Sequence, residues 1–92
     1  MIQSFRHRGL KRLYERDEAR GIRADLLPKV MTVLAHLDGA ETVEDMNLPG
    51  FRLHPLKGDR KGLWSVSVSG NWRIVFRLER GDAFDVELLD YH

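Results

Sequence analysis

The chain has 92 residues, of which 42% are hydrophobic and 32% are charged, and its formal net charge is +1. This composition is typical of one small folded domain and excludes a disordered chain. There is no cysteine, which excludes disulfides and thiolate metal sites, and no apolar run is long enough to span a membrane. We therefore expect a single domain over residues 1–92, located by default in the reducing cytoplasm.

The near-neutral total hides a segregation of charge along the chain. Residues 1–30 carry a net charge of +4 and residues 52–80 carry +5, whereas residues 31–51 and 81–92 each carry −4. Segregation of this kind can form a basic surface on a protein of small net charge. Such a surface would suit a phosphate-rich partner. The ordinary alternative is that these charged side chains form a hydrated surface without a binding role.

The first half of the chain predicts two helices. Residues 2–5 alternate apolar and polar side chains loosely, which favours a short strand. Residues 9–20 combine good helix formers with apolar residues at i, i+3 and i+4, so we predict a helix there. A second helix is predicted from Asp25, as N-cap, to Gly39, with Pro28 in its first turn.

The second half predicts strands, because the hydrophobic period changes from 3.6 to 2 after a loop at residues 42–51. "LWSVSVSG", "NWRIVFRLE" and "AFDVELLDYH" each alternate apolar and polar residues, and "SGN" and "RGD" join them as hairpin turns. The predicted apolar face comprises Trp64, Val66, Val68, Trp72, Ile74, Phe76, Leu78, Phe84, Val86 and Leu88. We expect an α+β domain with two helices on one face of a mainly antiparallel sheet of about four to five strands.

The opposite face of this sheet is predicted to be polar. Its hydroxyl and guanidinium groups come from Ser65, Ser67, Arg73 and Arg77. Both types of group hydrogen-bond phosphate oxygens, and a Lys/Arg-rich loop at residues 57–61 lies beside them in the sequence. The alternative is a solvated sheet face in which Arg73 pairs with Asp85 or Glu87, and residue types alone leave both interpretations open.

Histidines and the last residues are the other candidates for chemistry. His54 precedes a proline, which favours extended backbone, and imidazole is a common proton-transfer group in catalysis. A single histidine in a strand is equally compatible with a structural role. Tyr91 and His92 end the chain, where residues usually fray, so position alone favours no function for them. His7 and His36 have no partners at metal-ligand spacing and are expected to be structural.

Taken together, these residues resemble the RelE/ParE toxin superfamily and, within it, the HigB group of plasmid-maintenance killer toxins. The similarity runs from "IQSFRHRGLKRL" through "DMNLPGFRLHPLKGDRKGLWSVSVSGNWRIVFR" to "VELLDYH", and the middle run and the final "DYH" are its most specific parts. The resemblance implies a RelE-like fold and a toxin that cleaves mRNA in the A site of the 70S ribosome, with no metal or other cofactor. It also implies a HigA-like helix-turn-helix antitoxin as partner, and contact with operator DNA only through the toxin–antitoxin complex.

The resemblance also assigns the functional residues. The active-site set of the family falls here on His54, Lys57, Arg73, Asp90, Tyr91 and His92. The histidines would move protons, Lys57 and Arg73 would hold negative charge on the phosphate, Tyr91 would stack on a base or position the phosphate, and Asp90 would tune His92. Contacts to RNA or the ribosome are expected from Arg6, Arg8, Lys11, Arg12, Arg60, Lys61 and Arg77.

Two other functions stay open on the sequence. A gyrase inhibitor of the ParE type would share the fold and would act on a protein target without catalysis. A non-enzymatic RNA-binding module or corepressor would use the basic segments alone. His54 and the terminal Tyr91–His92 pair argue against the gyrase inhibitor, because an inhibitor without catalysis has no need of them.

Overall fold

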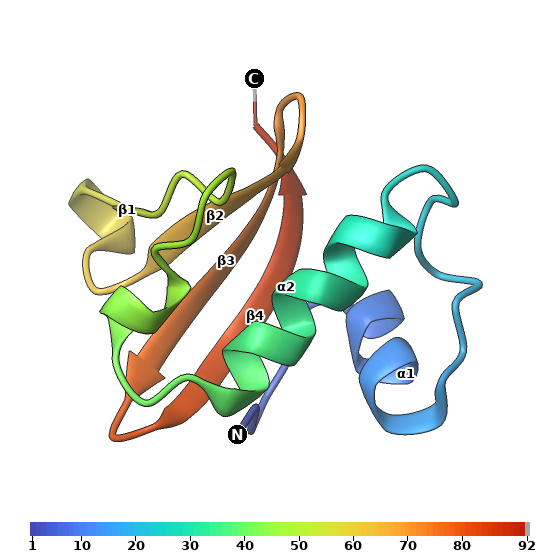
Figure 1. The fold of residues 1–92 in the computed structure, drawn as a ribbon, viewed down its shortest axis with the longest axis horizontal. Coiled ribbons are helices and arrows are strands. Elements are labelled where there is room, and N and C mark those ends of the chain that lie inside the picture. The colour runs from blue at the N-terminus through green and yellow to red at the C-terminus, as the bar shows by residue number, and fades with distance from the viewer. Residues whose placement is uncertain (92) are drawn as a thin grey trace.

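The computed structural model describes residues 1–91 and consists of two helices packed on one face of a four-stranded antiparallel sheet (Figure 1). The strands lie in chain order, β1-β2-β3-β4, and each pairs with its neighbours. The elements are α1 (Arg8–Arg16), α2 (Leu27–Gly39), the 3-10 turns η1 (Val43–Met46) and η2 (Gly58–Arg60), and the strands β1 (His54–Pro55), β2 (Trp64–Ser69), β3 (Trp72–Glu79) and β4 (Asp82–Asp90). The predicted α+β architecture is confirmed.

The core lies between the helices and the sheet. Fully buried side chains come from both helices, η1 and the three long strands: Leu10, Val30, Val33, Leu37, Met46, Val66, Ile74, Phe76, Ala83 and Val86. Each large apolar side chain buried in this way contributes about 1.5–3 kcal/mol, before the entropic cost of ordering it. The N-terminal segment adds Ile2 and Phe5, which form isolated parallel bridges with β4 in place of the predicted strand. Within residues 1–91, no helix has the length and apolarity needed to cross a membrane.

The helix ends differ from the prediction. Helix α1 ends earlier than expected, because Asp17 adopts a left-handed conformation with φ of 55° and its N–H bonds back to two carbonyls of the helix. Helix α2 starts after Leu26, which provides no side-chain cap. The predicted cap, Asp25, instead forms a two-pronged ion pair with Arg23. A nearby arginine therefore competes successfully for the capping carboxylate.

One prediction about the sheet was wrong: Phe84 does not face the core. The β3–β4 register shifts between Val75 and Arg77, so that Arg77 pairs with Phe84, and Asp85 has a φ of 56°. This bulge turns Phe84 onto the polar face, where its ring centre lies 5.0 Å from the Arg77 guanidinium. The small Ala83 is buried in the core instead, beside the bridge to the N-terminal segment.

The two histidines expected to be structural have structural contacts. The His7 Nδ1 caps α1 by accepting a hydrogen bond of 3.1 Å from the Leu10 N–H. The His36 ring meets Phe51 edge-on, with ring centres 5.7 Å apart. Burial lowers the pKa of His7 below its ordinary value of 6.5, against a smaller opposing effect of Glu87. Protonation would also block the cap, because a protonated Nδ1 cannot accept a hydrogen bond.

We therefore expect a pH dependence of stability that originates at His7. Because the folded-state pKa is lowered, the stabilisation is present above pH 6.5 and is lost as the pH falls below it. The free energy of unfolding should decrease by about 1 kcal/mol between about pH 8 and pH 5, the usual value of an N-cap. His7→Asn keeps an acceptor that does not titrate and should flatten this dependence in urea unfolding. An equal slope in both proteins would contradict the assignment.

Candidate active site

The candidate active site lies on the sheet face opposite the helices (Figure 1). His54 on β1 pairs with Ser65 on β2, and Ser67 on β2 pairs with Arg73 on β3. Paired residues, and residues two apart along a strand, present their side chains on the same face. The antiparallel register therefore brings His54, Ser65 and Arg73 to one surface from distant points in the sequence.

Tyr91 follows the end of β4 and contacts the Arg73 side of this surface. Its N–H donates a hydrogen bond of 2.7 Å to the Asn71 carbonyl in the β2–β3 turn, so this residue is anchored and not frayed. Its hydroxyl accepts a hydrogen bond of 2.8 Å from Arg60 Nη1. The guanidinium carbons of Arg60 and Arg73 lie 5.6 and 6.0 Å from the ring centre. The tyrosine thus joins a loop cation and a strand cation into one cluster.

Arg73 is half-buried and its charge is uncompensated. Its Nη1 lies 3.4 Å from the hydroxyl of Ser65, which lies on the predicted face of the sheet but is fully buried there. Within residues 1–91 it forms no ion pair, so the expected alternative of pairing with Asp85 or Glu87 does not occur. Asp85 instead forms an ion pair with Arg77, with 3.4 Å between Arg77 Nη2 and Asp85 Oδ2. Of the two strand arginines, Arg73 is therefore the one available to an anion.

His54 has a defined tautomer. Its Nδ1 lies 3.1 Å from the Arg52 carbonyl oxygen. A carbonyl can only accept, so Nδ1 carries the hydrogen in this contact and the neutral ring presents an unprotonated Nε2. The half-buried imidazole is consequently arranged to take up a proton at Nε2.

Two further residues of the predicted catalytic set, Lys57 and Asp90, lie before η2 and at the end of β4. Lys57 precedes η2, is exposed and has no ion-pair partner within residues 1–91. Asp90 is the last residue of β4, where it pairs with Trp72, and it directly precedes Tyr91 in the chain. His92 lies outside the described residues. No group of three His, Asp or Glu side chains in residues 1–91 is arranged to hold a metal ion.

A pocket of about 150 Å³ adjoins the cluster. Its lining combines two cations, three carboxylates and three apolar side chains: Arg6, Asp59, Arg60, Leu63, Val75, Asp85, Glu87 and Leu89. Arg6 reaches it from the N-terminal segment and lies 3.9 Å from Asp85. Asp59 and Glu87 were not among the predicted site residues, although strand alternation placed Glu87 on the polar face of the sheet.

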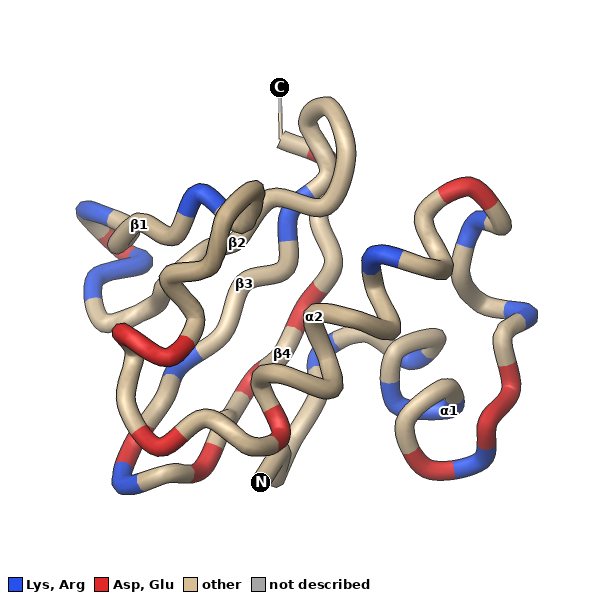
Figure 2. Tube along the Cα trace, in the orientation of Figure 1, with Lys and Arg blue, Asp and Glu red and all other residues tan. Residues whose placement is uncertain are grey.

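The other predicted RNA contacts lie on α1, after η2 and on β3 (Figure 2). Arg8, Lys11 and Arg12 are exposed on α1, with Glu15 and Arg16 around a shallow depression outside the active-site cluster. Lys61 is exposed directly after η2, whereas the neighbouring Arg60 belongs to the cluster. Arg77 is engaged by Glu79 and Asp85.

Comparison with known proteins identifies the class. Residues 3–92 match the family described as the RelE-like toxin of type II toxin–antitoxin system HigB. The chain is 42% identical to Endoribonuclease HigB of Proteus vulgaris over 92 residues, which is the full length of both proteins. It is 30% identical to Toxin HigB-1 of Vibrio cholerae serotype O1, covering 96% of this chain and 95% of that protein. The chain therefore belongs to the HigB-like toxins of the RelE superfamily.

The fold agrees with this assignment. The crystal structure of YafQ from Escherichia coli strain BL21(DE3) superimposes with a TM-score of 0.54 at 18% identity, covering 95% of this chain and 87% of YafQ. At this level of identity the likeness concerns the fold alone. As a type II toxin, the protein has an antitoxin as partner.

The contact between Arg60 and Tyr91 gives a direct test of the cluster. Arg60→Ala removes the hydrogen bond to the hydroxyl and the guanidinium beside the ring. We expect the ring proton resonances of Tyr91 to shift in NMR spectra and its amide to exchange faster with solvent. Lys61→Ala removes a neighbouring cation without such a contact and is the matched control. Equal spectra for the two variants would place Arg60 outside the cluster.

Proposed function

We propose that this toxin is a ribosome-dependent endonuclease that cleaves mRNA in the ribosomal A site by attack of the substrate 2′-OH on the adjacent phosphate. Membership of the HigB-like family, with 42% identity to an endoribonuclease over the whole chain, makes the protein an endoribonuclease toxin. The observation that carries the mechanism is Arg73, a half-buried cation with no carboxylate partner among residues 1–91, beside His54 and Tyr91.

The substrate supplies its own nucleophile in this reaction. The 2′-oxygen forms a bond to phosphorus while the bond to the 5′-oxygen breaks, giving a 2′,3′-cyclic phosphate and a 5′-OH end. One group must take the proton of the 2′-OH and another must give a proton to the leaving oxygen. The free Nε2 of His54 suits the first step. His92, which lies outside the described residues, is the proposed partner in the second step.

Charge stabilisation falls to the cations. The phosphate gains negative charge in the transition state, and donors already directed at that charge are the most effective catalysts. Arg73 is held by the buried Ser65 and meets no competing carboxylate within residues 1–91. Lys57 is proposed to assist from the loop. Arg60 orients Tyr91, whose ring is then available to stack on a base or to position the phosphate.

Binding to the ribosome is proposed to use a separate set of cations. Arg8, Lys11 and Arg12 on α1, and Lys61 after η2, are exposed and suit contacts to ribosomal RNA phosphates. The proposed site of action is therefore the cytoplasm. The antitoxin partner is proposed to be a HigA-like helix-turn-helix protein, through which the complex contacts operator DNA.

Mapping mRNA 5′ ends after brief induction tests the proposal against its rivals. Cuts inside translated codons support the nuclease. Double-strand DNA breaks with intact mRNA would instead indicate a gyrase inhibitor. Growth arrest with neither change would indicate a binding module. The tautomer of His54 and the anchoring of Tyr91 favour the nuclease, because neither binding alternative requires them.

Cleavage should require the ribosome. Tyr91 and Phe84 are the aromatic side chains available on this face to hold an unstacked RNA strand. The ribosome must then supply most of the positioning, a contribution of about 7–11 kcal/mol in well-oriented systems. Purified toxin should give little product from naked mRNA and defined cuts from mRNA in programmed 70S ribosomes. Equal cutting of both substrates would refute the ribosome dependence.

Arg73→Ala should affect the chemical step more than binding. Loss of one donor to a developing oxyanion usually costs about 10²–10³-fold in rate, so single-turnover cleavage should slow by about 10²-fold or more. Ribosome binding should change little, because the exposed cations remain. Arg77→Ala is the control from the same strand, since its charge is already engaged by carboxylates. Normal cleavage by Arg73→Ala would reduce Arg73 to a surface cation.

A further inference from the structure

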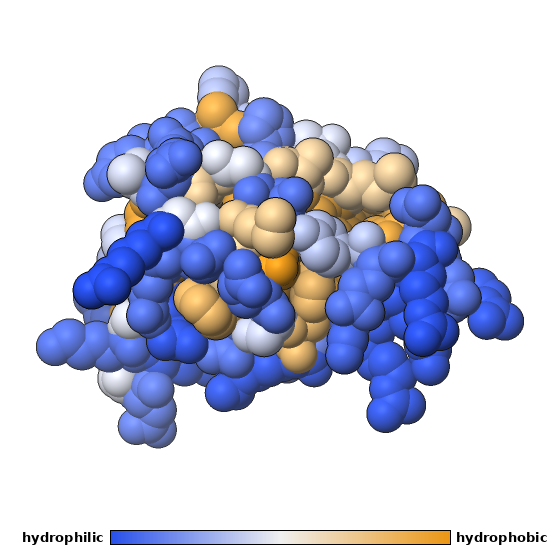
Figure 3. Space-filling view, turned by 90° about the horizontal axis from the view of Figure 1, so that it is seen from below, coloured by the Kyte–Doolittle hydropathy of each residue, from blue (hydrophilic) through white to orange (hydrophobic). Residues whose placement is uncertain are grey.

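Apolar side chains line the pocket beside the active-site cluster. Its volume is about 150 Å³, we call it the side pocket, and Leu63, Val75 and Leu89 contribute to its lining. Most of the surface on the side of the molecule shown in Figure 3 is hydrophilic, and apolar side chains are confined to a limited area there. An apolar lining next to a few polar groups is therefore a distinguishing feature, and it is typical of a ligand-binding site.

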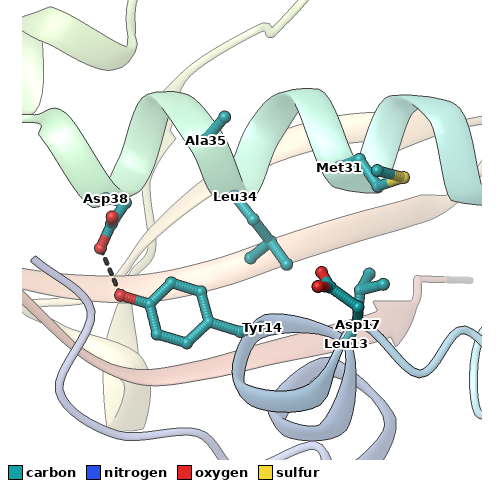
Figure 4. Close-up of a pocket in the computed structure, with 7 residues that line it drawn as sticks. All are labelled: Leu13, Tyr14, Asp17, Met31, Leu34, Ala35 and Asp38. Atoms are coloured by element: carbon teal, nitrogen blue, oxygen red, sulfur yellow. Dashed lines mark hydrogen bonds between the residues drawn. The ribbon is translucent and has the colours of Figure 1, made fainter.

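A second pocket, of about 190 Å³, lies between α1 and α2 on the helical side of the sheet (Figure 4). Its lining includes Met31, Leu34 and Asp38, and the Asp38 carboxylate accepts a hydrogen bond from the Tyr14 hydroxyl. Within residues 1–91, it shares no lining residue with the active-site cluster. Of these two pockets, the side pocket is therefore the one that can contact a substrate held at Arg73.

The side pocket continues directly from the candidate active site. Arg60 lines the pocket, and its Nη1 donates the hydrogen bond of 2.8 Å to the Tyr91 hydroxyl. Leu89 lines the pocket from β4, and its partner across the ladder is Arg73. Glu87 lies two residues before Leu89 on the same face, about 6.5 Å along the strand. A phosphate held by Arg73 therefore leaves the adjacent nucleotide within reach of the pocket.

Two carboxylates of the side pocket have no protein partner. Asp85 is engaged by Arg6 at 3.9 Å and by Arg77 at 3.4 Å. The side chains of Glu87 and Asp59, by contrast, form no hydrogen bond or ion pair within residues 1–91. Glu87 is half-buried, so its carboxylate has lost part of its hydration without gaining a donor. A ligand that brings hydrogen-bond donors into the pocket would supply this missing partner.

The size and the lining of the side pocket fit a nucleobase. Its volume is below the about 300–1,000 Å³ of sites for larger ligands and suits a single ring system. The apolar side chains offer a surface on which a flat ring can pack, whereas the free carboxylates repel a phosphate. An endoribonuclease acts on RNA, and the bases are the uncharged parts of that substrate.

We propose that the side pocket binds the base of a nucleotide next to the scissile phosphate, and that Glu87 selects a base with an exocyclic amino group. Its carboxylate accepts a hydrogen bond from N6 of adenine, N4 of cytosine or N2 of guanine. Uracil carries oxygens, O2 and O4, in place of an amino group, and a carboxylate cannot donate to them. The pocket therefore disfavours uracil. This inference rests on the proposed function, because it places part of the cleaved RNA in the pocket.

Binding of single nucleotides tests the side pocket without cleavage. The probes are 3′-AMP, 3′-CMP, 3′-GMP and 3′-UMP, titrated into isotope-labelled toxin and followed by NMR. The amide resonances of Glu87 and Leu89 should reach half of their full shift at about tenfold lower concentration with the first three than with 3′-UMP. Equal affinity for all four nucleotides would overturn the inference. Shifts confined to Arg73 and Tyr91 would do so as well, because the base would then lie outside the pocket.

Cleavage specificity tests the role of Glu87. On programmed 70S ribosomes, mRNAs that differ in a base flanking the cut should be cleaved about tenfold more slowly when uracil occupies the selected position. Glu87→Gln keeps the size of the side chain and adds a donor for the uracil oxygen, so this ratio should fall to about threefold or less. Glu44→Gln makes the same change on the exposed part of η1, outside the pocket, and should keep the original ratio.

The ratio compares substrates of one protein preparation, so a variant that is only partly folded gives the same value. An unchanged ratio in Glu87→Gln would refute the assignment of Glu87. The absence of any uracil discrimination in the unsubstituted toxin would refute it too. If the unsubstituted toxin cuts no mRNA on the ribosome, the nuclease proposal fails, while the nucleotide titration still decides this inference.

Discussion

The β3–β4 ladder is the interaction on which the rest of this small domain depends. It carries the longest pairing in the sheet, from Trp72 opposite Asp90 to Glu79 opposite Asp82. One face gives the core Ile74, Phe76 and Val86, and the other gives the active site Arg73. The N-terminal segment adds two bridges along β4, and the chain leaves β4 directly into the anchored Tyr91. A shift of this ladder by one residue would exchange the core side chains for those of the candidate active site.

The bulge in this ladder also sorts the two arginines of β3. It brings Phe84 and Asp85 next to Arg77. The Phe84 ring packs against the guanidinium, and the Asp85 carboxylate forms an ion pair with it. Arg73 lies beyond the bulge, where the facing residue of β4 is Leu89 and no carboxylate is within reach in residues 1–91. Two arginines four positions apart on one strand thus acquire opposite roles, one holding the sheet together and one directed at an anion. In the sequence, both are arginines on the polar face of the same predicted strand. Only the register with β4 distinguishes them.

Elements that follow from hydrophobic periodicity were predicted correctly from the sequence. Features that depend on competition between neighbouring side chains were not predicted. Alternation located the three long strands and the apolar stripe located α2, because both patterns are imposed by burial on one side. The bulge at Asp85 is invisible to alternation, so Phe84 was placed in the core. Asp25 has the right type for an N-cap, but Arg23 binds it more closely than the helix does. Arg60 was grouped with Lys61 by composition, whereas its contact with Tyr91 depends on packing between a loop and the end of the chain.

Arg73, which forms no ion pair within residues 1–91, affects both the stability of the free protein and the proposed cleavage of RNA. Its half-buried guanidinium has lost part of its hydration and, within residues 1–91, meets a neutral hydroxyl and a ring but no carboxylate, so it is poorly stabilised in the free protein. A phosphate restores the missing partner, and a phosphate that gains charge in the transition state restores it more completely. A carboxylate opposite Arg73 in place of Leu89 would stabilise the free protein and weaken that preference. The marginal electrostatics of this position are therefore the physical basis of the proposed preference for the charged transition state over the bound substrate.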